Sequence, residues 1–286
     1  MGRLVYPSSP WRWVSEQMAA TERLRTRHVE KPWGRKQLAA PFDNTPGDTI
    51  GEIWFEPPTE ADELLLKYIF TSERLSVQVH PNDDQAMAAG LGRAGKEECW
   101  YVLDAEPGAK LAIGFKRSVS RDEMQREAED GSIMDLLAWH NVKPGDFFYI
   151  PANTVHAIGA GISIIEIQQN SDVTYRLYDY GRPRELHLDD ALAIAEREPY
   201  DMSLHCQVGD VGNALLVDGP YFRLWRVDGA SNDGKPASSG KAFVLPYRGS
   251  ITVGSERVEP GQCMFAQDAG EISFSPGALG FMAQPL

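Results

Sequence analysis

Hydrophobic positions along the chain fall into many short runs instead of a few long ones. From Gly51 onward these runs are rich in β-branched and aromatic residues, and Gly, Pro, Asn and Asp separate them. This pattern is typical of β-strands joined by tight turns. We expect strands at residues 53–56, 64–70, 75–80, 99–103, 110–115, 147–150, 162–168 and 173–178.

Helical patterns interrupt this series. We expect helices at 83–90, 120–137 and 189–196. Ser120 and Glu123 fit a capping box at the start of the second helix, and Gly131 is expected to divide that helix in two. A further helix is expected at 11–25, followed by a sharp turn at Lys31-Pro32-Trp33-Gly34.

A shift in composition near Pro199 marks the start of a second region. Its expected strands are 221–227, 242–245, 250–253, 262–266, 271–274 and 280–283. Many short strands at close spacing favour a sandwich or barrel over a parallel sheet. We expect a peripheral segment at 1–30, a first β domain at 31–200 and a smaller β-sandwich domain at 201–286.

Composition narrows the class of protein. The 286 residues are 42% hydrophobic and 24% charged, which is ordinary for a soluble globular protein. No stretch approaches the roughly 18 apolar residues of a membrane helix, and the first residues contain no apolar signal core. The three cysteines are widely spaced and odd in number, so we expect neither a disulfide framework nor a thiolate metal site. We expect a reducing, cytoplasmic location.

The net charge of −13 argues against nucleic acid and anionic membranes as partners, since both select for basic surfaces. It also constrains the substrate. If the substrate is a phosphate, the positive charge that binds it must be local, because the field of the whole molecule repels anions.

The segment 75–82 contains the first candidate chemistry. Side chains two positions apart in a strand point to the same face, so Ser76, Gln78 and His80 share one face. An imidazole and an amide between hydrophobic flanks suggest the inside of a barrel. Taken alone, His80 fits a hydrogen-bonded structural histidine better than a metal ligand.

Two later segments support a site. The segment that begins at Lys96 opens a strand, and Lys96 and Glu98 lie on one face of it. In the segment 145–156, Gly, Pro and His156 have the spacing of the second cupin motif, with Asn153 where that motif usually has glycine. Asn is the residue next best able to adopt a positive φ.

Together, Gln78-x-His80-Pro81 and the delayed Lys96-x-Glu98 resemble the type I mannose-6-phosphate isomerases, in their short bacterial form, within the cupin superfamily. The resemblance extends from about Lys31 to Arg176. It implies a mainly β fold: a cupin (double-stranded β-helix or jelly-roll) barrel with a few inserted helices, and a second, smaller cupin-like β domain. The domain at 31–200 would be the catalytic, metal-binding one.

The resemblance also implies a metal site. His80, Glu98 and His156 would be the protein ligands and Gln78 a fourth, although its amide could instead bind a water. Two imidazoles, a carboxylate and an amide oxygen suit a borderline divalent ion, and one Zn²⁺ per chain is expected.

The family's Glu, Ser-Asp and Arg residues are matched in register by Glu166, Ser171-Asp172 and Arg176. Arg176 thus corresponds to the active-site arginine. A lysine that follows in longer members is missing here, and Arg182 and Arg184 are candidates for its role.

Residues for the chemistry are then assigned by resemblance and charge. Lys96, close to Glu98 and so to the metal, is the first acid/base candidate, and Glu166 is the alternative base. Arg176 is expected to act electrostatically, because its pKa is too high for a base. Ser76, Trp33 and Asp172 are expected to contact the substrate.

The expected activity is interconversion of mannose 6-phosphate and fructose 6-phosphate through an enediol. A metal cupin that acts on another sugar phosphate stays open, as does an iron oxygenase, which also uses two histidines and a carboxylate. A non-catalytic, sugar-binding regulatory cupin is the alternative from another class. Lys96, Glu166 and Arg176 together favour catalysis over both, because oxygen chemistry or binding alone could do without them.

Overall fold

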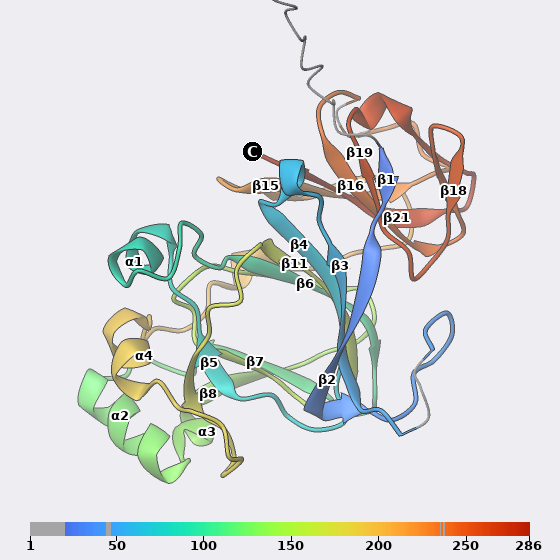
Figure 1. Ribbon diagram of the computed structural model, residues 1–286. Helices are drawn as coiled ribbons and strands as arrows, with labels where there is room; N and C mark the ends of the chain where they lie inside the picture. The colour runs from blue at the N-terminus through green and yellow to red at the C-terminus, as the bar shows by residue number, and fades with distance from the viewer. Residues whose placement is uncertain (1–20, 44–46, 235, 237) are drawn as a thin grey trace, which may run out of the picture.

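The computed structural model describes residues 21–43, 47–234, 236 and 238–286. Two antiparallel sheets enclose the barrel (Figure 1). The larger sheet runs, in spatial order, β13 (His205–Gln207), β9 (Asp146–Ile150), β6 (Glu98–Ala105), β11 (Ile162–Gln169), β4 (Leu64–Phe70), β3 (Ile50–Glu56) and β2 (Arg25–Arg35). The smaller sheet runs β12 (Tyr175–Tyr178), β5 (Val77–Val79), β10 (His156–Ile158), β7 (Lys110–Phe115) and β8 (Leu137–Asn141).

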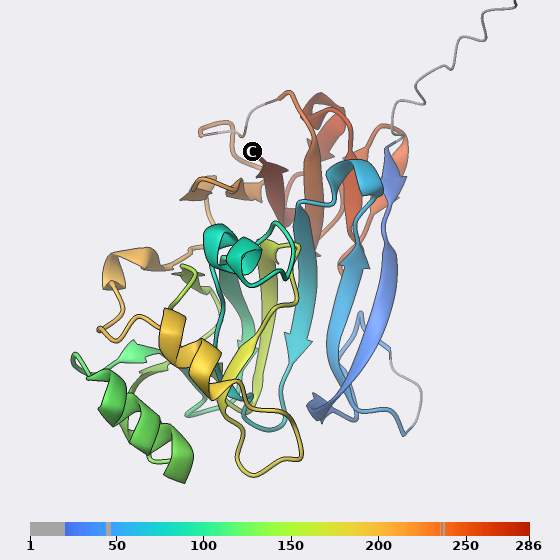
Figure 2. The same cartoon turned by 60° about the vertical axis from the view of Figure 1, so that its left-hand side comes forward.

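Two more sheets form the C-terminal region, which packs on the outer face of the larger barrel sheet (Figures 1 and 2). One runs β1 (Glu22–Arg23), β19 (Met264–Ala266), β16 (Ala242–Arg248), β21 (Leu279–Pro285), β15 (Phe222–Asp228) and β14 (Ala214–Asp218). The other runs β18 (Glu256–Val258), β17 (Ile251–Val253) and β20 (Ile272–Phe274). The predicted mainly β architecture with a second β region is therefore confirmed, whereas the domain limits at residues 30 and 200 stay a prediction.

Short helices interrupt the strands, and all but the first pack over the smaller barrel sheet (Figure 2). They are α1 (Asp83–Ala88), α2 (Arg121–Asp130), α3 (Ile133–Leu136) and α4 (Leu188–Ile194), with single 3-10 turns at Thr59–Ala61, Met202–Leu204 and Ala269–Glu271. Gly131 ends α2 with a φ of 88°, as predicted. Among the described residues, no helix combines the length and the apolar character needed to cross a bilayer.

The main apolar core lies between the larger barrel sheet and the six-stranded sheet. Phe55, Tyr68 and Ile165 from the barrel pack in one cluster with Phe243 and Phe281 from the C-terminal region. The outward side chains of the larger sheet are thus buried against the six-stranded sheet. Its inward side chains face the inside of the barrel and can form a site.

The start of the described chain corrects the predicted helix at 11–25. Residues 11–20 lie outside the described residues, but Glu22–Arg23 and the residues from Arg25 onward are strands. β1 pairs with β19, and β2 pairs with β3, where Arg27 forms an ion pair with Glu56 at 3.3 Å. The alternating charges lie on strands at sheet edges. A local charge pattern cannot distinguish such an edge strand from an exposed helix.

Two further predictions are corrected. The Lys31–Gly34 signal is not a turn between elements but an irregularity inside β2, because Glu30 and Arg35 both pair with Ile50. A Cβ on Gly34 would lie 2.5 Å from the backbone nitrogen of Gly51, so only glycine allows this close approach.

The capping box predicted at Ser120 forms only in half. Ser120 accepts a hydrogen bond from the backbone of Glu123 at 3.1 Å, but the Glu123 carboxylate pairs with exposed Arg117 instead. The complete capping box is at α1, between Asn82 and Gln85.

Candidate metal centre and active site

Three strands bring two histidines and a carboxylate together inside the barrel. His156 on β10 pairs directly with Gln78 on β5, which places it beside His80 at the end of β5, and Glu98 faces both from β6. Ligand atoms of His80, Glu98 and His156 all lie within 4.8 Å of one another. Each residue is at most 2% exposed, so the group is fully inside the protein.

Hydrogen bonds hold both imidazoles in the form that binds metals. Nδ1 of His80 donates to the carbonyl of Val173 at 2.8 Å, and Nδ1 of His156 donates to the carbonyl of Thr154 at 2.9 Å. Burial lowers the pKa of both histidines, so each ring is neutral with its free lone pair on Nε2. The Nε2 atoms lie 3.5 Å and 3.3 Å from Glu98 oxygens. Neutral imidazoles fixed through their other nitrogen, next to a carboxylate, fit a divalent ion.

Asn153 connects the two histidine segments. Its φ of 70° confirms that it occupies the position where the motif usually has glycine. Its backbone and side-chain nitrogens both donate to the carbonyl of His80, at 2.8 Å and 3.1 Å. The loop before His156 is therefore fixed directly to the strand that carries the other ligand.

Gln78 faces the same group through its nitrogen. Its Nε2 lies 3.2 Å from Nε2 of His156, while its Oε1 accepts a hydrogen bond from Ser76 at 3.1 Å. A ligand role through the oxygen would require the amide to turn over, so the assignment of Gln78 as fourth ligand stays a prediction.

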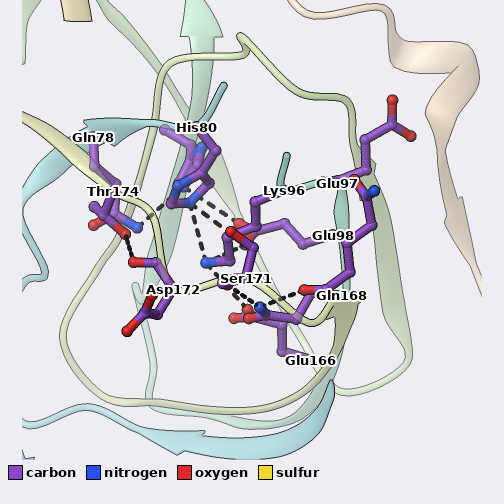
Figure 3. A network of polar contacts seen from close by, with 12 residues as sticks. Gln78, His80, Lys96, Glu97, Glu98, Glu166, Gln168, Ser171, Asp172 and Thr174 are labelled. Carbon is purple, nitrogen blue, oxygen red and sulfur yellow. Dashed lines mark hydrogen bonds and ion pairs between the residues drawn. The ribbon is translucent and has the colours of Figure 1, made fainter. Parts of the chain in front are cut away.

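Lys96 and Glu166 lie directly beside the histidine-carboxylate group (Figure 3). Nζ of Lys96 is 2.8 Å from Oε2 of Glu98, 3.2 Å from Nε2 of His80 and 3.6 Å from Oε1 of Glu166. Burial, and then the negative charge of Glu98, raises the pKa of Glu166 to about 7. The pKa of Glu98 is lowered although burial opposes this, because Lys96 and the histidines surround it.

Sequence reasoning missed two charged residues of the same inner wall. Lys67 of β4 forms an ion pair with Oε1 of Glu166 at 3.1 Å, and Glu52 of β3 forms one with Lys31 at 3.5 Å. Burial acts to lower the pKa of Lys67, but Glu166 and Glu52 outweigh it and raise the pKa. A lysine inside the apolar run 64–70 was the available signal, because a buried lysine requires a buried partner.

Of the residues described above, Glu52, Lys67, Gln78, Lys96, Glu98 and Glu166 line a cavity of about 210 Å³, whereas His80 and His156 are not part of its wall. It is below the roughly 300–1,000 Å³ of drug-sized pockets, which suits a small substrate. The predicted residues on its wall are Trp33, Ser76, Gln78, Lys96, Glu98, Glu166, Asp172 and Arg176. A wider depression of about 740 Å³ adjoins it and shares Trp54, Ser171 and Asp172 with its wall.

The structure separates the two arginines proposed for the role of the missing lysine. Arg184 lines the cavity, and buried Asp179 holds its guanidinium at 2.5 Å and 2.7 Å. Arg182 instead binds Glu73 and Asp179 and is not part of the cavity wall. Burial, and then the charge of Arg184, lowers the pKa of Arg176. Nε of Arg176 is buried and has no hydrogen-bond partner in the described part of the chain.

Comparison with known proteins found relatives of one kind. The mannose-6-phosphate isomerase ManA of Bacillus subtilis is 36% identical over 252 residues, which cover 82% of this chain and 78% of that protein. The mannose-6-phosphate isomerase of Streptococcus mutans is 38% identical over 282 residues, covering 82% of this chain and 87% of that one. Comparison with models of protein families gave no match.

Solved structures agree with the sequence relatives. The crystal structure of the mannose 6-phosphate isomerase from Bacillus subtilis has a TM-score of 0.76 at 25% identity, covering 93% of this chain and 100% of that one. A zinc-bound mannose 6-phosphate isomerase has a TM-score of 0.70, covering 94% of this chain and 100% of that one. At 15% identity, the second likeness concerns the fold alone.

Proposed function

The chain belongs to the mannose-6-phosphate isomerase family, and on this premise we propose that it interconverts mannose 6-phosphate and fructose 6-phosphate with one bound zinc ion. One observation carries the proposal. Two neutral imidazoles and a carboxylate converge in the barrel, and a lysine and a second carboxylate lie beside them on a small cavity.

We propose His80, Glu98 and His156 as the zinc ligands, with Gln78 as a fourth. Nitrogen and carboxylate donors in this number are typical of catalytic zinc sites. Bound there, zinc supplies a Lewis acid for the negative charge that develops on the sugar oxygens. The carbonyls of Val173 and Thr154 keep both imidazoles oriented toward it.

Lys96 and Glu166 are proposed to transfer the proton. The base takes a proton from C2 of the open-chain aldose and returns it to C1, while a second proton passes from O2 to O1, which gives the ketose through an enediol. Lys96 remains the first candidate from its position next to Glu98. The pKa of about 7 favours Glu166, because a base works best when its pKa is near the working pH.

Arg176 and Arg184 are proposed to bind the phosphate. They are neighbouring cations on the cavity wall, and the buried Nε of Arg176 is a donor without a partner among the described residues. Two guanidiniums provide the local positive charge that a dianion needs on a chain of net charge −13. Trp33, Ser76 and Asp172 are proposed to contact the sugar.

The cytoplasm is the proposed location. Cys99 and Cys263 are buried free thiols and Cys206 is an exposed one, which fits a reducing compartment. The proposed partner is the small sugar phosphate, with no role for nucleic acid or a membrane surface.

A coupled assay of the purified protein tests the proposal. Interconversion of the two sugar phosphates should stop after chelation and return when zinc is added, and Lys96→Met should remove most of it. A folded, zinc-loaded protein without turnover would contradict the activity. Sugar-phosphate binding without turnover would instead support a regulatory protein.

A further inference from the structure

Gln168 is a buried amide on the cavity wall that the proposed chemistry does not use. It lies on β11 two residues after Glu166, so both side chains face inward, and it pairs across the sheet with Glu98. Only 1% of its surface is exposed. Nothing in the motifs of the sequence singles it out.

Two hydrogen bonds fix the orientation of the amide. Nε2 of Gln168 donates to the carbonyl of Gln169 at 2.8 Å and to the carbonyl of Ser171 at 2.7 Å (Figure 3). Both amide hydrogens are therefore used, and turning the amide over would set its oxygen against two carbonyl oxygens. The oxygen must be the atom that faces away from these carbonyls.

That oxygen has no donor. Oε1 of Gln168 is buried and accepts no hydrogen bond from any residue that the structure describes. A buried acceptor without a donor is unfavourable, and Met would fill the position without this cost. The amide is thus held with its acceptor ready and its donors occupied.

We propose that Oε1 of Gln168 accepts a hydrogen bond from a hydroxyl group of the bound sugar phosphate and that Gln168 is a specificity-determining residue. The identity of the ligand as a hexose phosphate rests on the proposed function. A hexose phosphate provides donors only through its hydroxyls. Oε1 of Gln168 is an acceptor and Nε of Arg176 a donor, and neither has a hydrogen-bond partner among the described residues. Because both residues line the same cavity, these two atoms match a ligand with hydroxyls and an anionic group. A site built around such a contact rejects an analogue that lacks the hydroxyl.

Binding of an unreactive ligand tests this without turnover. The probe is mannitol 6-phosphate, the reduced sugar, which cannot isomerise, together with the five analogues that each lack one of its hydroxyls. Calorimetry on zinc-loaded wild type and Gln168→Met should give a Kd for mannitol 6-phosphate about tenfold higher in the variant. The analogue that lacks the contacted hydroxyl should bind both proteins within about twofold of each other.

Three results would overturn the inference. An equal loss of affinity for mannitol 6-phosphate and every deoxy analogue would mean that the variant only disturbs the cavity. A lower zinc content in Gln168→Met would mean that the oxygen serves the metal. Unchanged affinity would mean that the oxygen contacts no ligand. Absence of isomerase turnover in the wild type would contradict the proposed function and leave this binding comparison intact.

Discussion

The barrel and the C-terminal region use the same kind of antiparallel strand but fill their interiors differently. Between the barrel sheets lie buried charged and titratable side chains: Glu52, Lys67, His80, Lys96, Glu98, His156 and Glu166. Between the two C-terminal sheets lies an apolar cluster that includes Val227, Val244, Ile251, Met264 and Met282. Among the described residues, the one His/Cys/Asp/Glu group able to hold a metal is in the barrel. Strand architecture therefore carries no activity by itself; the inward side chains do.

The two interiors also differ in energy. Apolar side chains stabilise the C-terminal region simply by leaving water. The charged side chains of the barrel lose hydration on burial, and only their partners offset that loss. Removing one member of the barrel array should therefore affect its neighbours, whereas truncation in the apolar cluster should affect stability alone.

The largest expected effect follows from removing a proposed metal ligand. His156→Ala should lose bound zinc and lower isomerase activity by more than about 100-fold. That loss exceeds the one expected from mutating a residue that only hydrogen-bonds a metal ligand. The matched control is Met264→Ala in the apolar cluster. It should lower the free energy of unfolding by about 2–5 kcal/mol and keep its zinc. Metal analysis and the coupled assay check both, and normal zinc content in His156→Ala would contradict the proposed site.

A smaller loss is expected from breaking the buried ion pair behind Glu166. Lys67→Met leaves Glu166 and Glu52 without their shared cation, so the free energy of unfolding should fall by about 3–5 kcal/mol. Activity should fall by roughly 10- to 100-fold because Glu166 is no longer held in position.

Arg223→Met is the control for Lys67→Met. Arg223 pairs with Asp218 at 2.6 Å on the exposed surface of the C-terminal region. This change should cost at most about 1 kcal/mol and leave activity unchanged. Chemical denaturation measures both variants, and equal costs would contradict the contrast between the two regions.

The smallest expected effect is the pH dependence of the wild type. If Glu166 takes the proton, it must be ionised, and with a pKa of about 7 its ionised fraction falls as the pH drops. The kcat should then decline about tenfold for each unit below pH 7. In Glu166→Gln the residual rate should lose this acid limb. Persistence of the limb in the variant would assign proton transfer to another group, with Lys96 first in line.

Much of the fold was predictable because strand alternation and turn residues are local properties. The strands at 64–70 and 110–115 form with the predicted limits, and Gly131 divides the α2–α3 segment as expected. Several missed strands are short, such as β10, where three residues follow a motif loop, but the 11 residues of β2 were missed as well. The helix predicted at 11–25 was wrong over residues 21–25. These residues are strands because they pair with β19 and β3, which lie further along the chain.

By itself, the sequence, through its resemblance to the isomerase family, identified the residues that we propose for the site. His80, Lys96, Glu98, His156, Glu166 and Arg176 lie in segments whose residue types and spacing carry that information locally. The tertiary structure alone decided which distant charges join them. Lys67, Glu52 and Gln168 face the cavity because β3, β4 and β11 are neighbours in one sheet. Arg184 lines the cavity and Arg182 does not because of how Asp179 and Glu73 hold the two guanidiniums. A local pattern such as Lys67 in an apolar run can indicate a buried charge, but its partner is set by contacts between residues remote in sequence.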